Sequence, residues 1–259
     1  MTAVTAAAGL AVAGCSAAPL KMGAAAIVGK NAISVASLTN ETYQLESTGK
    51  AYPGVYKLTA QQATQGTLSW LIRFKINDQL ASQAGISVSP GAAQTALNAV
   101  YEETKSEAAQ SGISNLSMQE FLVANGIPPN QQTELGQYLA INNAFVDAAN
   151  GGKPPTSETS PAVTKLTRST CLAAKSLSIQ VNPQFGVLNY TSYSVVNTPD
   201  TVSRASGTKK TASVAGLTPA CLPGRTVPPD PRGLPAGGTV PPDPRGLPAG
   251  GTVPPDPRG

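Results

Sequence analysis

The sequence predicts an α+β fold that is predominantly α-helical, with a small antiparallel sheet joining N- and C-terminal strands. Apolar residues recur at helical spacing between residues 59 and 175, and short apolar runs typical of strands lie at 24–28 and 177–181. Capping and turn residues separate these segments. We expect the order strand, five or six helices, strand, strand, with the first strand paired with the last ones.

The expected strands lie at the two ends of this body. Residues 24–34 (AAAIVGKNAIS) contain two apolar runs around a Gly-Lys-Asn turn, which indicates a short strand or hairpin leading into a helix. Residues 177–181 (LSIQV) alternate between apolar and polar, which is the period of a strand. Residues 182–186 (NPQFG) form a turn before a second apolar stretch at 193–196.

The longest expected helix begins at a capping box, residues 59–62 (TAQQ), and ends at Gly85. One buried face follows from four apolar residues at four-residue spacing, Leu68, Ile72, Ile76 and Leu80. Ser89 followed by Pro90 starts a second helix, and residues 117–120 (SMQE) form another capping box. A helix around residues 135–149 ends at Asn-Gly-Gly, and one more is expected over 162–175.

Residues 1–14 (MTAVTAAAGLAVAG) are typical of a lipoprotein signal peptide. This uncharged run is too short to span a bilayer of roughly 30 Å, and it ends at Cys15 in a Val-Ala-Gly-Cys sequence that resembles the bacterial lipobox. We therefore expect a diacylglycerol on Cys15, which anchors the protein in the lipid bilayer at the outer face of the plasma membrane. Such signals carry a positive N-terminal region, yet no Lys or Arg precedes Lys21. An Ala-rich helix over residues 1–28 with a buried cysteine is the alternative.

Residues 222–259 form a tandem repeat. The 13-residue unit TVPPDPRGLPAGG starts at residues 226, 239 and 252, and the third copy stops at Gly259. This segment holds 12 of the 23 prolines and too few aliphatic side chains to offset the entropy of ordering, so we expect it to be disordered. A spacer, a ligand for a proline-recognition domain and a repeat without function remain open. Residues 15–221 are then the folded part, long enough for one core or for two small subdomains.

The composition excludes many catalytic sites. The chain has no His, which rules out a Ser-His-Asp triad, a Cys-His pair and an HExxH zinc site. Neither a P-loop nor a dinucleotide fingerprint is present, and Glu102 and Glu103 with Lys105 and Glu107 are typical of a solvated helix face. The formal charge is +4, but the basic residues are scattered and not interleaved with aromatics. We expect no catalytic residue, cofactor, metal or nucleic-acid partner.

With Cys15 lipidated, two cysteines remain in an oxidising compartment. We expect Cys171 and Cys221 to form a disulfide that closes a span of about 50 residues and stabilises the fold by roughly 4 kcal/mol. The alternative is two free thiols.

Three segments resemble the SurA N-terminal-domain-like lipoproteins of actinobacteria: residues 23–29 (GAAAIVG) with 33–35 (ISV), 85–90 (GISVSP) and 181–186 (VNPQFG). The resemblance implies an extracytoplasmic chaperone that binds unfolded or exported polypeptides. Full-length relatives also carry parvulin domains, which are peptidyl-prolyl isomerases that usually place histidines in the active site. No such segment follows here, so isomerase activity is expected to be absent. The isomerase, and a structural or solute-binding envelope lipoprotein, are the alternatives.

A chaperone of this kind needs a concave apolar surface. Trp70 and Phe74 lie four residues apart, on a different face from the stripe that begins at Leu68, and are candidates for peptide binding. The alternative is that both rings pack in the core against another helix.

Overall fold

The computed structural model describes residues 22–113, 115–152, 160–197 and 221. Its elements are, in chain order, β1 (Ala24–Val28), β2 (Asn31–Ser34), α1 (Val35–Gly49), α2 (Ala60–Ala84), α3 (Pro90–Gln110), α4 (Met118–Ala124), the 3-10 helix η1 (Pro129–Gln131), α5 (Gln132–Ala149), α6 (Pro161–Ser176), β3 (Gln180–Val181), β4 (Val187–Asn189) and β5 (Ser194–Val196). The predicted, mainly helical α+β fold is confirmed. Cys15, residues 1–14 and the repeat lie outside the described residues.

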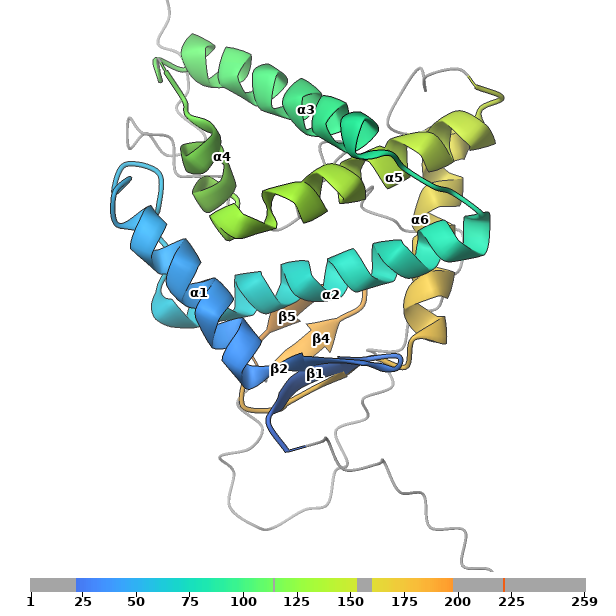
Figure 1. Ribbon diagram of the computed structural model, residues 1–259, viewed down its shortest axis with the longest axis horizontal. Helices are drawn as coiled ribbons and strands as arrows, with labels where there is room; N and C mark the ends of the chain where they lie inside the picture. Colours follow the sequence, from blue (N-terminus) through green and yellow to red (C-terminus); the bar gives the residue numbers. More distant parts are fainter. Residues whose placement is uncertain (1–21, 114, 153–159, 198–220, 222–259) are drawn as a thin grey trace, which may run out of the picture.

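Helix α2 runs through the middle of the molecule (Figure 1). Helix α5 and then α3 are stacked on one side of it, and the strands lie on the other. Helices α1 and α4 close one end, while α6 crosses the other end and contacts both α2 and α5. Helix α2 therefore lies between the strands on one side and the α3, α4 and α5 helices on the other.

A three-stranded antiparallel sheet joins the two ends of the folded chain, in the order β2-β1-β3. The β1–β2 hairpin turns at Gly29, whose φ of +61° is accessible to glycine at little cost. The pairing of Ala26 with Val181 brings the predicted N- and C-terminal strands together. The expectation that the last strand also pairs with the first is wrong, because β5 pairs with β4 in a separate two-stranded sheet.

Strand β3 is shorter than its alternating pattern predicts. Helix α6 continues to Ser176 with Leu177 as its C-cap, and Ser178 has a φ of +46°. A left-handed residue breaks the extended conformation, so pairing starts only at Gln180. The apolar side chains of Leu177 and Ile179 still pack against the core from this connection.

Helix α2 carries three rows of side chains with different partners. The first row contacts the core formed with β1, β2, α1, α5, α6, β4 and β5, and consists of Leu68, Ile72, Ile76 and Leu80. The second row contacts the core formed with α3, α4 and α5, and consists of Trp70 and Phe74. The two rows therefore separate two hydrophobic cores, as their different faces predict.

The third row is polar and holds the β4–β5 hairpin. It consists of Gln61, Gln65, Ser69 and Arg73, which are four residues apart and share a face of α2. Gln61 and Gln65 both donate to the side chain of Asn197, at 2.6 and 2.7 Å, and Gln65 also donates to the carbonyl of Phe185 at 3.0 Å. The Ser69 hydroxyl accepts from the amide of Val195 at 2.7 Å, and Arg73 donates to the carbonyl of Ser192 at 2.8 Å. These hydrogen bonds attach the hairpin to α2, because they satisfy backbone groups of the hairpin that do not bond between β4 and β5.

Gly186 is required where the chain enters this hairpin. Its φ is +124°, and an added Cβ would overlap the carbonyl oxygen of Val196. We expect Gly186→Ala to lower the free energy of unfolding by roughly 2–4 kcal/mol, because backbone strain and overpacking add. Gly66→Ala is the matched control: this helical position in α2 has no atom near the added Cβ, and alanine should raise stability by up to about 1 kcal/mol. Urea unfolding followed by circular dichroism measures both, and equal shifts would contradict the close approach.

Candidate functional site

The two aromatic rings proposed for peptide binding lie in the core. The exposed fractions of Trp70 and Phe74 are 2% and 6%. Both rings pack against Tyr138 of α5, with centroid distances of 5.8 and 6.2 Å, and the Trp70 indole donates to the carbonyl of Asn125 at 3.1 Å. The prediction that they form a client surface is therefore wrong. Four-residue spacing does not distinguish rings that face solvent from rings that another helix covers. Here α5 covers the rings of Trp70 and Phe74.

Arg73 is the buried cation of the described residues and was not identified from the sequence. Its exposed fraction is 6%, its guanidinium lies 5.0 Å from the centre of the Trp70 ring, and no described carboxylate forms an ion pair with it. Burial lowers the pKa of Arg73, against a smaller opposing effect of Tyr138. Nearby, burial raises the pKa of Tyr193 to about 12. The hydrogen bond to Ser192 gives Arg73 a structural role in fixing the hairpin.

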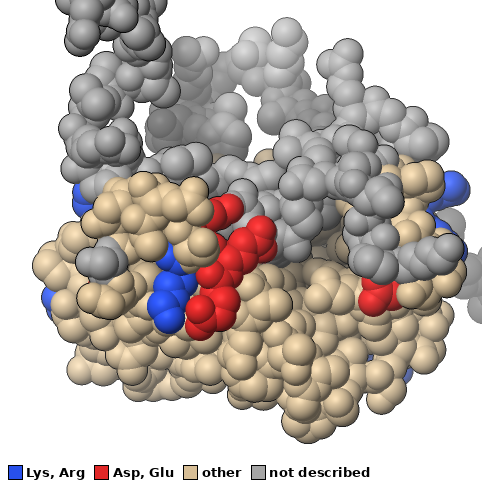
Figure 2. Space-filling model, turned by 90° about the horizontal axis from the view of Figure 1, so that it is seen from above, with Lys and Arg blue, Asp and Glu red and all other residues tan. Residues whose placement is uncertain are grey.

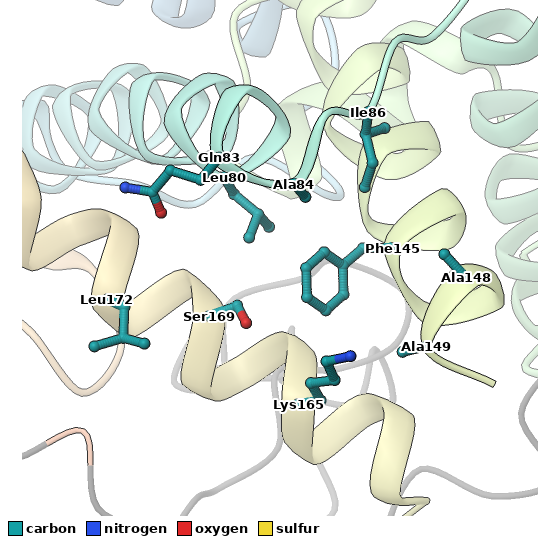
Figure 3. Close-up of a pocket in the computed structure, with 10 residues that line it drawn as sticks. All are labelled: Leu80, Gln83, Ala84, Ile86, Phe145, Ala148, Ala149, Lys165, Ser169 and Leu172. Atoms are coloured by element: carbon teal, nitrogen blue, oxygen red, sulfur yellow. The ribbon is translucent and has the colours of Figure 1, made fainter. Parts of the chain in front are cut away.

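An open pocket of about 370 Å³ lies where α2, α5 and α6 meet (Figure 3). Its lining residues are Leu80, Gln83, Ala84 and Ile86 from α2 and the segment after it, Phe145, Ala148 and Ala149 from α5, and Lys165, Ser169 and Leu172 from α6. The side chains of Leu80 and Phe145 point into the space between the helices and are buried at its base. Seven of the ten lining residues are apolar, while Gln83, Lys165 and Ser169 add polar surface, so the pocket suits an apolar group with a polar neighbour.

The spacing along each helix places these side chains. Lys165, Ser169 and Leu172 fall on one face of α6, and Phe145 with Ala148 and Ala149 on one face of α5. At the edge of the pocket Gln83 donates to the Ser176 hydroxyl at 3.1 Å, which ties the end of α2 to α6. Leu80 and Phe145 are therefore buried at the base of the pocket, while Gln83 and Lys165 lie at its exposed edge.

Two side chains at the pocket are available to a ligand. Leu172 has an exposed fraction of 49%, which is unusual for a large aliphatic residue on a packed helix. Lys165 is exposed, and it takes part in neither of the ion pairs that the structure describes. The pocket thus combines an apolar base, an exposed leucine and a cation that forms no ion pair with the described residues. Sequence reasoning missed it because its residues come from three helices that are distant in the chain.

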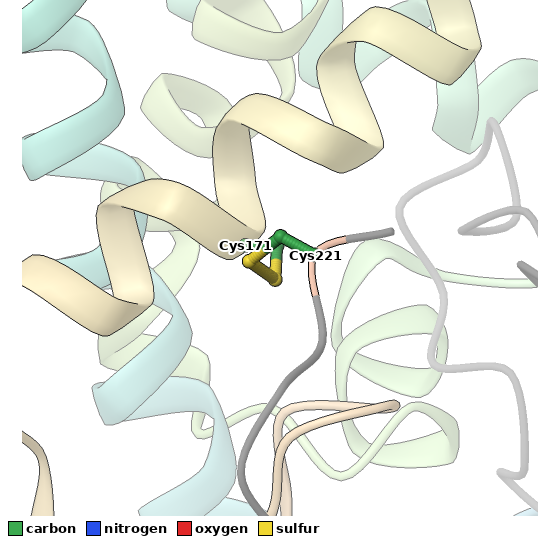
Figure 4. The surroundings of a disulfide bond; sticks show 2 residues. All are labelled: Cys171 and Cys221. Atoms are coloured by element: carbon green, nitrogen blue, oxygen red, sulfur yellow. A yellow bond between two sulfur atoms is a disulfide. The ribbon is translucent and has the colours of Figure 1, made fainter. Parts of the chain in front are cut away.

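A disulfide fixes the end of the described chain to α6 (Figure 4). It joins Cys171 to Cys221, with the two Cα atoms 5.8 Å apart. This is the pairing predicted from the sequence, in place of two free thiols. Cys171 is the residue before Leu172, so residue 221 is held beside the helix that forms one wall of the pocket.

The charged residues of α3 form a solvated surface, as expected. Figure 2 shows a group of acidic and basic side chains next to each other on one face, with a few further charged side chains apart from it and wide uncharged areas between them. Lys105 pairs with Glu102 at 3.6 Å and lies 5.6 Å from the centre of the Tyr101 ring. Within the described ranges, no group of three or more His, Cys, Asp or Glu residues is arranged to hold a metal ion. No described helix has the length and apolar character needed to cross a membrane.

Comparison of the chain with protein-family models, with characterised proteins and with solved structures finds no match. The resemblance to SurA N-terminal-domain-like lipoproteins therefore stays a prediction that three short segments carry. In the structure, residues 23–29 form β1 with the start of its turn, and residues 85–90 connect α2 to α3. Residues 181–186 form the end of β3 and the turn before β4.

Proposed function

We propose that this protein is a membrane-anchored extracytoplasmic chaperone that binds unfolded or exported polypeptides without catalysis. The observation that carries the proposal is the open apolar pocket between α2, α5 and α6, with Leu172 exposed at its edge. Unfolded chains differ from folded ones in presenting Leu, Ile, Val and Phe side chains to solvent. Burial of one such side chain in an apolar site contributes about 1.5–3 kcal/mol.

Weak binding of single side chains suits a chaperone that has no energy source. A contact of this size alone gives a dissociation constant of roughly 5–100 mM, so each contact breaks quickly. The sequence contains no P-loop, and clients are released by dissociation rather than by nucleotide hydrolysis. A client with several apolar segments binds and dissociates repeatedly. This delays its aggregation and still allows it to fold between binding events.

The proposed lipid anchor places this site near the membrane. Eight residues separate Cys15 from Ala24, the first residue of β1. An extended chain covers at most about 3.3–3.6 Å per residue, so a diacylglycerol on Cys15 keeps β1 within roughly 30 Å of the bilayer surface. Polypeptides that emerge from the membrane then meet the pocket at high local concentration.

The test is a charge placed at the edge of the pocket. We expect Leu172→Asp to weaken protection of urea-denatured citrate synthase against aggregation about tenfold, because a carboxylate in an apolar site opposes burial by at least 1.4 kcal/mol. Light scattering on dilution from urea, as a function of chaperone concentration, measures the effect. Half of the Leu172 side chain is already in solvent, so the variant is expected to fold.

Tyr43→Asp is the matched control. Tyr43 is an aromatic residue on α1 with an exposed fraction of 64%, it does not line the pocket, and its substitution by aspartate changes the charge equally. We expect it to protect as well as the wild type. Equal losses in both variants, or a wild type that gives no protection, would contradict client binding at the pocket.

A solute-binding lipoprotein is the second candidate, because 370 Å³ is also the size of a small-molecule pocket. Native mass spectrometry of the purified protein separates the two, since a solute-binding protein retains a small apolar molecule and a chaperone does not. A proline-isomerisation assay on a short peptide excludes or reveals a foldase.

A further inference from the structure

We propose that the C-terminal repeat of this chain, residues 222–259, is a ligand of its own α2–α5–α6 pocket and competes there with clients. The competition rests on the proposed function of the pocket, whereas the docking of the repeat does not.

The disulfide brings the start of the repeat to the pocket. Cys221 is bonded to Cys171, and Leu172, the next residue along α6, lines the pocket. Neighbouring residues are about 100° apart around a helix that is 10–12 Å wide. An extended chain spans about 3.3–3.6 Å per residue, so a few residues after Cys221 are enough to reach round α6 to the pocket. The first full repeat, residues 226–238, is therefore within reach.

Tethering makes a weak interaction sufficient. A segment joined to its site by a short linker has an effective concentration in the millimolar range. A repeat unit that binds with a millimolar dissociation constant in free solution then occupies the pocket for much of the time. Three Leu-Pro steps, at Leu222, Leu234 and Leu247, present the same side chains in turn and raise the occupancy further.

The Leu-Pro step matches the chemistry of the pocket. Leucine is suited to the apolar base formed by Leu80 and Phe145, and the fixed φ of proline reduces the conformational entropy lost on binding. Proline-rich segments dock against aromatic side chains in other recognition grooves for the same reason. Each of the two complete units thus offers one apolar anchor with a stiff backbone, at Leu234 and at Leu247.

Asp230 and Asp243 lie four residues before Leu234 and Leu247. Each repeat unit also carries an arginine two residues before its leucine, Arg232 or Arg245, so the unit has no net charge and its aspartate can contribute only through a local contact. Lys165, at the edge of the pocket, forms none of the described ion pairs. A repeat anchored by its leucine can place its carboxylate near this ammonium, an exposed pair that contributes up to about 1 kcal/mol.

Site-specific cross-linking in the full chain tests the docking. With p-benzoylphenylalanine in place of Leu172, irradiation is expected to give cross-links to peptides from residues 222–259 whose yield does not change on dilution. With the same group in place of Tyr43, such cross-links should be absent, because that residue lies on α1 away from the pocket. No cross-link to the repeat from position 172, or equal yields from both positions, would overturn the proposal.

The binding of a probe peptide tests the competition. A chain that ends at Cys221 is expected to bind a dansyl-labelled, uncharged Leu-rich decapeptide about 3–10-fold more tightly than the full chain, since the tethered competitor is gone. Serine at Leu222, Leu234 and Leu247 in the full chain should give the same gain while keeping the tail length. Equal affinity of all three proteins overturns the competition. Probe binding absent from every chain, together with cross-links from position 172, contradicts the proposed function and supports the docking of the repeat.

Discussion

Replacing Trp70 by alanine is expected to lower the free energy of unfolding by about 3–5 kcal/mol. The side chain is 98% buried where α2 meets α4 and α5, and it packs against the rings of Phe74 and Tyr138 and under the guanidinium of Arg73. Truncation opens a cavity that the surrounding helices cannot close by moving inward. It also removes the indole that donates a hydrogen bond to the carbonyl of Asn125. Urea unfolding followed by far-ultraviolet circular dichroism measures the loss.

Trp70→Phe is the control for this prediction. Phenylalanine keeps an aromatic ring beside Phe74 and Tyr138 but cannot donate to Asn125, so we expect less than half of the alanine effect. A Trp70→Ala variant that keeps wild-type stability and loses client protection would mean that the ring faces clients after all. That result would contradict the core described for α2.

Removing the disulfide is the second large change. The double variant Cys171→Ser, Cys221→Ser is expected to lose about 4 kcal/mol of stability, because the bridge closes a span of 50 residues in the unfolded chain. Urea unfolding of the variant and of the wild type, both without reductant, gives the difference. In the variant, cross-links from position 172 to the repeat should also decrease, since residue 221 is no longer held beside α6.

Reduction of the wild type supplies the control. A thiol reductant should lower the stability of the wild type to that of the double variant and leave the variant unchanged. Mass analysis under non-reducing conditions must find the two cysteines bonded in the native protein. Two free thiols, or a variant as stable as the oxidised wild type, would contradict the role given to the bridge.

The helices were predictable because their ends are local. In both predicted capping boxes the described side chains make the reciprocal hydrogen bonds, between Thr59 and Gln62 and between Ser117 and Glu120. A cap satisfies backbone amides within the same turn, so its residues reveal it without knowledge of the rest of the fold. Gly85 at the end of α2 has the left-handed conformation that its position predicts.

Tertiary partners were harder to predict. Nothing in the spacing of Trp70 and Phe74 tells whether α5 or solvent lies opposite, and the short β4 and β5 strands carry too few residues to identify each other. The polar row on α2 was a usable signal, since Gln65, Ser69 and Arg73 at four-residue spacing on a packed helix need partners. The pocket had no such signal, because each helix contributes only three or four of its residues.

Cross-linking from position 172 to a client tests most directly whether unfolded chains bind in the α2–α5–α6 pocket. The chain that ends at Cys221, with p-benzoylphenylalanine in place of Leu172, is mixed with urea-denatured citrate synthase on dilution and irradiated. We predict a cross-linked product that native citrate synthase does not give and that the same group in place of Tyr43 does not give. Equal labelling from the two positions, or no labelling from position 172, would contradict client binding in this pocket.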